Sequence, residues 1–544
     1  MTTTAQETTP AAIETVDAVV VGAGFSGLYT LRRLRELGLS ARCLEAGTDV
    51  GGTWHWNRYP GARSDSDSTV YSFSDYFNPD LLAEWKWSER YPSQPEIQSY
   101  LAWVADREGL RGNITFGTKV TGAQFDAASG RWTIETDSGR TVTAKYFIPA
   151  VGVLSTPNMP AFPGLDTFEG QWHHTARMPE QDIDFTGKRV AVIGNGATAV
   201  QIIPVVARTA AQVYEFSRNP YHCLPGRNHE LDAEDWKAIE SSHPEIFEKA
   251  RANFGGFPYP DFAGIGAEMS PEERRDVLER LWEKGGLTPA FSGFADVLTD
   301  REVNGFVLDF LREKIANVVR DPALAERLSP TSPFVSKRPP IEHGYYAAFN
   351  RDNVAIVDMK DNPVAEVTST GIRMTDGTEH EVDVILFATG FDAYTGALYS
   401  MNIRDTNGVL LQERWADRPA TYIGMTVPGF PNMFLHYCGP QNPAILTNGP
   451  TLIEQQGEWI GDFLAHMESK GHRVVDTRQD AADEFLALHD TISNMTVIPD
   501  TASWWTGTNV DGKPNGLLSW CGGFPEYRRI CDEAVADYAG FRFD

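Results

Sequence analysis

Cysteine, positive charge and long apolar runs are all scarce in this sequence of 544 residues. Its five cysteines are scattered and include no Cys-x-x-Cys pair, which argues against a disulfide framework, a zinc site and a redox-active dithiol. Scattered, reduced cysteines are typical of a cytoplasmic protein. Lysine and arginine number 47 against 74 acidic residues, so the net charge is −27. Such a surface repels polyanions, which argues against nucleic acid and anionic membranes as partners.

No uninterrupted apolar run is long enough to span a bilayer, so we predict no membrane span. Residues 1–15 are rich in Thr and Ala and contain acidic residues but no basic one. This composition predicts a flexible tail, not a secretory signal. The remaining length suggests about three domains.

A glycine-rich turn near the N-terminus follows a short apolar strand, residues 16–21, and opens a helix. Gly22, Gly24 and Gly27 form the Gly-x-Gly-x-x-Gly pattern, in which backbone N–H groups and the helix dipole bind a pyrophosphate. Glu45 ends the next predicted strand, where an acid accepts hydrogen bonds from a ribose diol and repels a 2′-phosphate. The turn therefore predicts a site for FAD or NAD.

A second turn of the same kind lies in the middle of the chain. Gly194, Gly196 and Ala199 follow a strand of branched residues and open a helix, which is the dinucleotide fingerprint in its proper context. The next strand ends at Arg218, and an arginine there favours a 2′-phosphate and hence NADPH. The acid Glu215, three residues earlier, would disfavour a 2′-phosphate, although the alternation of side chains along the strand can point it to the other face. Two such sites predict two nucleotide cofactors that exchange electrons.

Residues 51–65 combine paired glycines, two tryptophans and a Pro-Gly turn, and they end in Asp65. This stretch resembles the Gly-Gly-Thr-Trp…Tyr-Pro-Gly-Ala-Arg-x-Asp segment of the flavin-dependent Baeyer–Villiger monooxygenases. The resemblance implies that Gly52, Thr53 and Trp54 line the flavin and that Asp65 orients a catalytic arginine. On the residues alone, Asp65 is a solvated turn acid and the tryptophans are core residues.

The stretch before the second turn is similar to the signature of the same family, Phe-x-Gly-x-x-x-His-x-x-x-Trp-Pro or -Asp. Phe168, Gly170, His174 and Pro179 match it. Met178 replaces the tryptophan and also differs from the related N- and S-oxidising flavin monooxygenases, so the motif identifies the superfamily better than the branch. We expect His174 to act in a linker that changes shape between oxidation states, and not as a catalytic base, because no charge partner stands near it.

Later segments resemble the family in the same order along the chain. Lys337 and Arg338 match its Lys-Arg pair, which implies that Lys337 helps to select NADPH and that Arg338 is the catalytic arginine. A surface basic pair is the plain alternative. The segment after a Gly-Pro pair implies a ketone pocket that includes Pro440 and Leu446. Trp504 is similar to a tryptophan that meets the nicotinamide nucleotide from a mobile segment.

The predicted fold is α/β, with two dinucleotide-binding (Rossmann-like) domains, one for FAD and one for NADP, and a helical insertion in the NADP domain. We expect the FAD domain to comprise residues 16–155 and 381–544. The NADP domain is predicted at 156–225 and 331–380, and the insertion at 226–330.

The resemblance implies a monooxygenase that uses NADPH and O2, forms a flavin C4a-peroxide, and converts a cyclic or bulky ketone to an ester or lactone. A permanently charged arginine suits this chemistry, because negative charge develops on oxygen. Two other classes stay open. An N- or S-oxidising flavin-containing monooxygenase would depend less on Arg338, and an NADPH oxidase or reductase would give no oxygenated product.

Overall fold

The computed structural model of the protein describes residues 13–544; residues 1–12, most of the predicted tail, lie outside the described part. The predicted end of the tail at residue 15 needs correction, because strand β1 (Glu14–Val21) begins inside it. Glu14 is fixed there by ion pairs with Arg42 and Arg140, which hold the start of the strand against the sheet. None of the helices in the described part combines the length and apolar character needed to cross a membrane.

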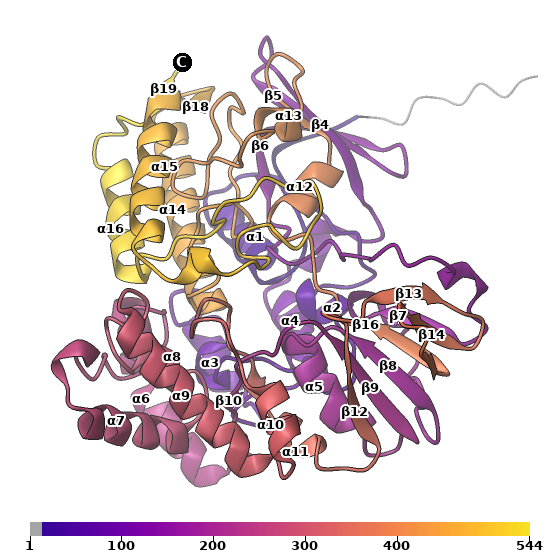
Figure 1. Cartoon of the computed structure of the whole chain (residues 1–544). Helices are drawn as coiled ribbons and strands as arrows, with labels where there is room; N and C mark the ends of the chain where they lie inside the picture. Colours follow the sequence, from indigo (N-terminus) through magenta and orange to yellow (C-terminus); the bar gives the residue numbers. More distant parts are fainter. Residues whose placement is uncertain (1–12) are drawn as a thin grey trace, which may run out of the picture.

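A seven-stranded sheet forms the centre of the first unit, in the upper part of Figure 1. Its strand order is β17-β4-β5-β6-β1-β2-β3, with β1 parallel to both β2 and β6, and with β5 antiparallel to both β4 and β6. The parallel part carries the first glycine turn at the carboxyl end of β1, where open α/β sheets bind their ligands. The other strands are β2 (Ala41–Leu44), β3 (Ile114–Thr115), β4 (Val120–Asp126), β5 (Arg131–Thr136), β6 (Thr141–Pro149) and β17 (Ile403–Arg404).

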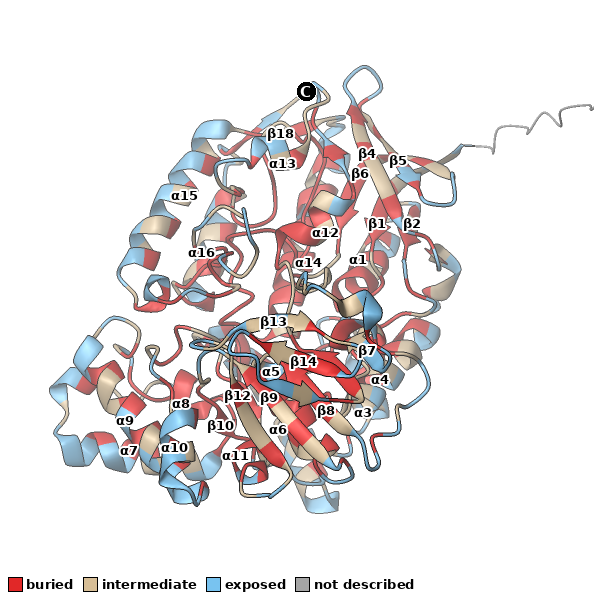
Figure 2. Cartoon of the chain, turned by 45° about the vertical axis from the view of Figure 1, so that its right-hand side comes forward, coloured by how far each residue is buried: buried red, intermediate tan, exposed pale blue. Residues whose placement is uncertain are grey.

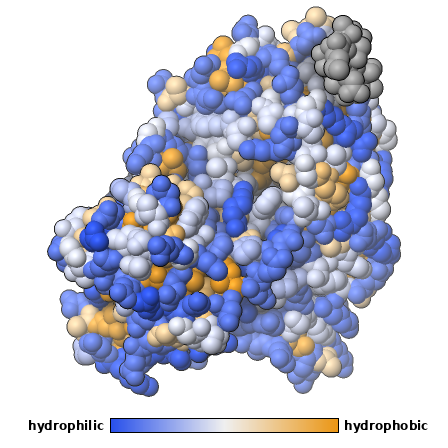
Figure 3. Space-filling model, turned by 90° about the vertical axis from the view of Figure 1, so that its right-hand side faces the viewer, coloured by the Kyte–Doolittle hydropathy of each residue, from blue (hydrophilic) through white to orange (hydrophobic). Residues whose placement is uncertain are grey.

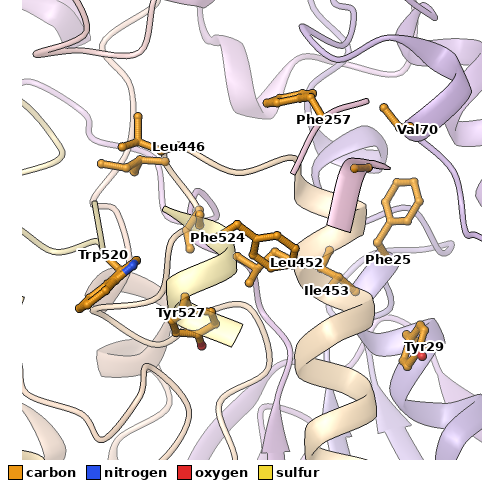
Figure 4. Packing of buried hydrophobic residues seen from close by; sticks show 14 of the residues in the cluster. Phe25, Tyr29, Val70, Phe257, Leu446, Leu452, Ile453, Trp520, Phe524 and Tyr527 are labelled. Carbon is orange, nitrogen blue, oxygen red and sulfur yellow. The ribbon is translucent and has the colours of Figure 1, made fainter. Parts of the chain in front are cut away.

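Helix α1 (Phe25–Glu36) packs on this sheet, and helix α14 (Gly449–Lys470) packs closely against α1. A Cβ atom at Gly457 would lie 2.3 Å from Cδ1 of Tyr29, so the absence of a side chain allows this approach. α16 (Phe524–Ala534) packs against α14 and presents apolar residues to the same core. Figure 4 shows labelled members of that core from these three helices, namely Phe25, Tyr29, Leu452, Ile453, Phe524 and Tyr527.

The second unit is built on a five-stranded, fully parallel sheet of order β12-β9-β8-β16-β7. Its central strands β8 (Arg189–Ile193) and β16 (Val384–Phe387) are almost wholly buried and apolar, as expected for strands covered on both faces. The prediction that the chain re-enters the FAD domain at residue 381 is wrong, because β16 still pairs with β7 and β8 of the second sheet. The remaining strands are β7 (Gln171–His174), β9 (Gln212–Ser217) and β12 (Val354–Asp358).

Two chain segments, residues 153–158 and 390–394, run antiparallel between the two sheets, and we call them the crossover ribbon. Backbone N–H groups of Asn158 and Asp392 donate to the carbonyls of Gly390 and Thr156, each over 2.9 Å. Pro157 and Phe391 form an antiparallel bridge between these bonds. The two units are therefore joined by a hydrogen-bonded pair of strands.

The predicted insertion, 226–330, contains a group of amphipathic helices, at the lower left of Figure 1. Ser270 caps α7 as its sequence predicts, since its hydroxyl accepts the N–H of Glu273 and Pro271 occupies the first turn. Figure 2 shows that the insertion helices expose their outer faces. These helices are α6 (Ala233–Ala252), α7 (Pro271–Lys284), α8 (Thr288–Phe291), α9 (Arg301–Val318) and α10 (Pro322–Leu328).

The face of the molecule shown in Figure 3 is mainly hydrophilic, with scattered apolar spots. The remaining helices and strands of the described chain are short or lie outside the two main sheets. The predicted α/β class is confirmed by the two sheets and their covering helices. The other helices are α2 (Thr53–Trp56), α3 (Pro79–Glu84), α4 (Gln94–Arg107), α5 (Ala197–Val206), α11 (Tyr345–Ala348), α12 (Thr395–Ser400), α13 (Leu411–Arg414) and α15 (Gln479–Asn494). The other strands are β10 (Leu224–Pro225), β11 (Ile341–Glu342), β13 (Val364–Val367), β14 (Gly371–Met374), β15 (Glu379–Glu381), β18 (Val475–Thr477) and β19 (Phe541–Phe543).

Candidate active site

The first glycine turn forms one wall of a cavity of about 410 Å³, which we call the flavin cavity. Gly22 has φ +99°, a conformation that favours glycine. A Cβ atom at Gly27 would lie 1.8 Å from the carbonyl oxygen of Gly22, so the turn closes only with glycine there. α1 then begins after Gly24 without a side-chain cap, which leaves its first N–H groups facing the cavity.

Glu45 lines the flavin cavity directly after β2 and is 4% exposed. Its carboxylate accepts the N–H groups of Ala23 and Gly47, each over 2.6 Å. Burial raises the pKa of Glu45, and these two N–H groups act against that rise. Each oxygen keeps a second acceptor position, so hydrogen bonding to a ribose stays a prediction that the geometry allows.

The predicted flavin loop reaches the same cavity through Gly52, Thr53 and Trp54. Gly52 lies so close to the first turn that a Cβ at Gly24 would approach its Cα to 3.3 Å. Trp54 donates its indole N–H to the hydroxyl of Tyr71 over 3.1 Å, and Tyr71 also lines the cavity. The sequence carries no signal that would have picked out Tyr71.

The second glycine turn follows β8 in the same way. Gly194 has φ +109°, and a Cβ there would lie 2.4 Å from the carbonyl oxygen of Ala388. Gly196 is open, since a Cβ there would meet no protein atom within 4 Å. Ala199 takes the third place of the pattern and is fully buried in the core under α5. The turn therefore presents an uncovered backbone at Gly196, as a phosphate site requires.

Two cations from different parts of the chain lie near each other after β9. Arg218 directly follows β9 and is exposed, whereas Lys337 is half-buried with its ammonium 5.4 Å from the centre of the Tyr221 ring. Burial lowers the pKa of Lys337, and the charge of Arg218 lowers it further. Across residues 13–544, neither cation has a carboxylate within 4 Å. The structure thus brings together the two residues predicted to select NADPH.

Glu215 does not compete with these cations, which confirms that strand alternation turns it away. It is buried beneath β9 and accepts the hydroxyl of Tyr345 over 2.7 Å. Burial raises its pKa to about 7, while the hydrogen bond from Tyr345 acts to lower it.

Arg338 lies close to one residue of the flavin cavity and to the loop predicted to line the ketone pocket. Its guanidinium donates to the carbonyl oxygen of Ile445 over 3.2 Å, next to Leu446, which is 2% exposed. Pro440 is buried in the same loop. Tyr437 lines the flavin cavity, and the charge of Arg338 acts to lower the pKa of that tyrosine against a rise caused by burial. Arg338 therefore adjoins the flavin cavity, and its contact with a ketone stays a prediction.

Asp65 is half-buried and its carboxylate accepts the N–H of Ile341 over 3.4 Å, so it is no freely solvated turn acid. Burial raises its pKa to about 6, and the nearby charge of Arg338 and the N–H of Ile341 limit that rise. In the described chain these two side chains do not form an ion pair within 4 Å. Their coupling is electrostatic, and the direct partner of Arg338 is the Ile445 carbonyl. Orientation of Arg338 by Asp65 stays a prediction.

His174 ends β7 and joins it to the crossover ribbon. Its Nδ1 accepts the N–H of Ala176 over 3.1 Å, which leaves Nε2–H to donate to the carbonyl of Gly390 over 3.2 Å. Burial lowers its pKa to about 4, so the ring stays neutral with both nitrogens occupied. This arrangement favours a linker role over that of a general base. The other matched signature residues, Phe168, Gly170 and Pro179, precede or follow β7 in the chain.

Gly170 and Met178 show how the signature stretch fits the second unit. A Cβ at Gly170 would lie 2.5 Å from the carbonyl oxygen of Asp383, which explains the glycine there. Met178, the departure from the family pattern, is buried in the core beside α5. Phe168 is buried on the opposite face of the sheet.

Trp504 belongs to a segment that is fastened to the crossover ribbon. It is half-buried and packs edge-on against Trp505, with ring centres 6.0 Å apart. The Asn509 side chain donates to the Phe391 carbonyl over 2.8 Å, and Lys513 forms an ion pair with Asp392 at 2.6 Å. Contact of Trp504 with a nicotinamide nucleotide stays a prediction. The described residues include no cluster of three or more His, Cys, Asp or Glu that could hold a metal ion.

Comparison with known proteins gives consistent similarities. Residues 16–228 match a family model described as flavin-binding monooxygenase-like. The chain is 41% identical over 514 residues to a Baeyer–Villiger monooxygenase of Pseudooceanicola batsensis, covering 94% of this chain and 93% of the relative. It is 38% identical over 528 residues to the phenazine N-monooxygenase PhzNO1 of Lysobacter antibioticus, covering 96% of each. The solved structure of OTEMO in complex with FAD and NADP matches with a TM-score of 0.93 at 37% identity, covering 99% of this chain and all of that one.

Proposed function

Because the chain belongs to the type I Baeyer–Villiger monooxygenases of the flavin-binding monooxygenase-like family, we propose that Arg338 is the centre of a ketone oxidation that consumes O2. The protein is an NADPH-dependent flavin monooxygenase that converts ketones to esters or lactones. Its cofactors are FAD and NADP(H). The observation that carries the proposal is the place of the Arg338 guanidinium close to the flavin cavity and to the Ile445–Leu446 loop.

The residues present fit both cofactors. The glycine turn and the uncapped start of α1 offer N–H donors to the diphosphate of FAD. The cations Arg218 and Lys337, unneutralised within the described chain, suit the 2′-phosphate of NADPH. When bound, FAD would supply the redox chemistry by which electrons of NADPH reach O2. We accordingly assign the seven-stranded sheet to the FAD domain and the five-stranded sheet to the NADP domain.

Arg338 supplies a fixed positive charge where negative charge develops on oxygen. A guanidinium stays protonated at any working pH, so it cannot quench that charge by proton transfer. Donors held in place inside a site with little water stabilise such charge most strongly. The hydrogen bond to the Ile445 carbonyl fixes one N–H group and leaves others free for the reacting oxygen. Leu446 follows the hydrogen-bonded Ile445 and brings apolar surface beside Arg338, which favours exclusion of water from the ketone; Pro440 is buried in the same loop.

Product analysis tests this function against its rivals. We expect the FAD-loaded protein, with NADPH and O2, to convert cyclic and bulky ketones to lactones or esters. An N-oxidising enzyme is the second candidate, because a phenazine N-monooxygenase is 38% identical and Met178 departs from the signature. Formation of N-oxides or sulfoxides without any ester would favour that branch. Release of H2O2 as the sole product under every condition would leave an oxidase.

The pH dependence of ketone oxidation should report the ionisation of Asp65. Its pKa of about 6 lies above the usual aspartate range because burial disfavours the charged form. The carboxylate is therefore present above pH 6 and is lost as the pH falls through that value, together with its pull on Arg338. We expect kcat to decrease below about pH 6, and Asp65→Asn to have a low kcat without that step.

Asp67 offers a control for this pH profile, because it is paired with Arg90 at 2.6 Å and with Tyr259 at 2.7 Å. An Asp67→Asn protein should keep the step near pH 6. A wild-type profile that is flat between pH 5 and pH 7.5 would refute the role of Asp65.

The location of the protein is a further part of the proposal. All five cysteines are free and buried, as suits a reducing compartment. We place the protein in the cytoplasm on that ground.

A further inference from the structure

Arg177 is a cation of the flavin cavity that no family motif requires. It ends the short 3₁₀ turn after β7, at a variable position of the signature stretch. Its side chain lines the flavin cavity together with Trp56 and Ser155. The guanidinium carbon lies 4.4 Å from the centre of the Trp56 ring, a stacking distance for arginine on an aromatic face.

The hydrogen bonds of Arg177 fix its position but do not balance its charge. Nη1 donates to the carbonyl of Ala176 over 2.6 Å, and Nη2 donates to the carbonyl of Ser155 over 3.3 Å. Both acceptors are neutral backbone groups. The Ser155 carbonyl belongs to the crossover ribbon, so the guanidinium is held by the ribbon on one side and by Trp56 on the other.

No carboxylate between residues 13 and 544 comes within 4 Å of the Arg177 guanidinium. The nearby Arg58 does have one, since it pairs with Glu180 at 3.5 Å. Partial burial lowers the pKa of Arg177, although the side chain still reaches solvent. Arg177 is an exposed residue of the cavity wall, and in a chain with 74 acidic residues and 47 basic ones no acidic neighbour competes with an anionic ligand for its guanidinium.

The other groups on the cavity wall identify the class of that ligand. Gly22 and Gly24 and the uncapped start of α1 line the same cavity and suit a diphosphate. A guanidinium has five N–H donors, and two backbone acceptors leave several of them free. Charged hydrogen bonds from arginine to phosphate are among the strongest in proteins.

Resting on the proposed function, we infer that Arg177 binds a diphosphate oxygen of a dinucleotide cofactor, in the first place FAD, from the ribbon side of the flavin cavity. The diphosphate of NADP+ has the same chemistry and is the second ligand that Arg177 could contact in this way. Arg177 thereby couples cofactor binding in the first unit to the connection between the two units.

The test compares FAD release from three FAD-loaded variants, namely Arg177→Gln, Arg177→Lys and the control Arg58→Gln. Each holoenzyme is diluted at low and at high salt, and the recovery of flavin fluorescence gives the dissociation constant. We expect Arg177→Gln to weaken FAD binding by about tenfold or more and to reduce the salt dependence, because one charged contact is lost. Arg177→Lys should recover part of the affinity, and Arg58→Gln should resemble the wild type.

A parallel titration of each oxidised holoenzyme with NADP+ separates the two sources. A weaker NADP+ affinity with unchanged FAD release would support the diphosphate contact and assign it to NADP+. Unchanged affinity for both cofactors in Arg177→Gln would overturn the inference. So would equal losses in the Gln and Lys variants with wild-type salt dependence, because they would reveal a purely structural contact with Trp56. These readouts do not involve ketone oxidation, so they stand apart from a failure of the proposed function.

Discussion

The Arg338→Ala protein should bind FAD and consume NADPH, yet form ester or lactone at a rate at least about 10²- to 10³-fold below that of the wild type. The expected loss is large because the guanidinium is the permanent positive charge beside the Ile445 carbonyl and the flavin cavity. FAD binding should persist, since Arg338 is not one of the residues that line the flavin cavity. Chromatography of ketone products and the consumption of NADPH, followed in parallel, measure the two effects.

Two further variants test whether the loss of rate comes from the charge and shape of the Arg338 guanidinium. Arg338→Lys keeps a positive charge but loses the planar fork, so we expect it to recover only part of the rate. Lys337→Ala should instead raise the KM for NADPH while ketone oxidation at saturating NADPH stays measurable. Ester formation by Arg338→Ala at a near wild-type rate would remove this residue from the catalytic centre.

The Gly27→Ala protein should be purified without FAD and should therefore be inactive. Its Cβ atom would lie 1.8 Å from the Gly22 carbonyl oxygen, a distance that cannot be relieved by rotating a side chain. Opening the turn would displace the N–H groups that face the flavin cavity. The ratio of flavin to protein absorbance after purification measures the loss, and circular dichroism shows whether the fold survives.

Gly112→Ala is a matched control for this substitution. A Cβ atom at Gly112 would meet no protein atom within 4 Å, so this variant should retain its full complement of FAD. The prediction for Gly27 is wrong if its alanine variant is isolated with the same flavin content as Gly112→Ala.

The two glycine turns could be read from the sequence because their function depends on local backbone geometry. Gly22 and Gly194 have positive φ, and Ala199 shows that the third place tolerates a methyl group in the second turn only. Alternation along β9 also gave the correct direction for Glu215. In each case a short stretch of chain contains the whole physical reason.

Features that depend on contacts between distant segments of the chain could not be predicted from the sequence. β16 was assigned to the wrong domain, because an apolar strand of four residues fits either sheet and only its partners β7 and β8 decide. Tyr71 reaches the flavin cavity from a stretch without a distinctive pattern, and Arg177 reaches it from a variable position of the signature stretch. The direct partner of Arg338 is a backbone carbonyl, and no sequence pattern marks such an acceptor.

The crossover ribbon constrains how the two cofactor sites can move relative to each other. A single connecting strand would allow the two units to rotate about it. The two segments of the ribbon are hydrogen-bonded at Asn158 and Asp392, so they resist twisting more than bending. His174 and Arg177 attach to the ribbon through the carbonyls of Gly390 and Ser155. Twisting one unit against the other would break these hydrogen bonds, whereas bending the ribbon can keep them, so the pairing favours bending as the motion between the two sites.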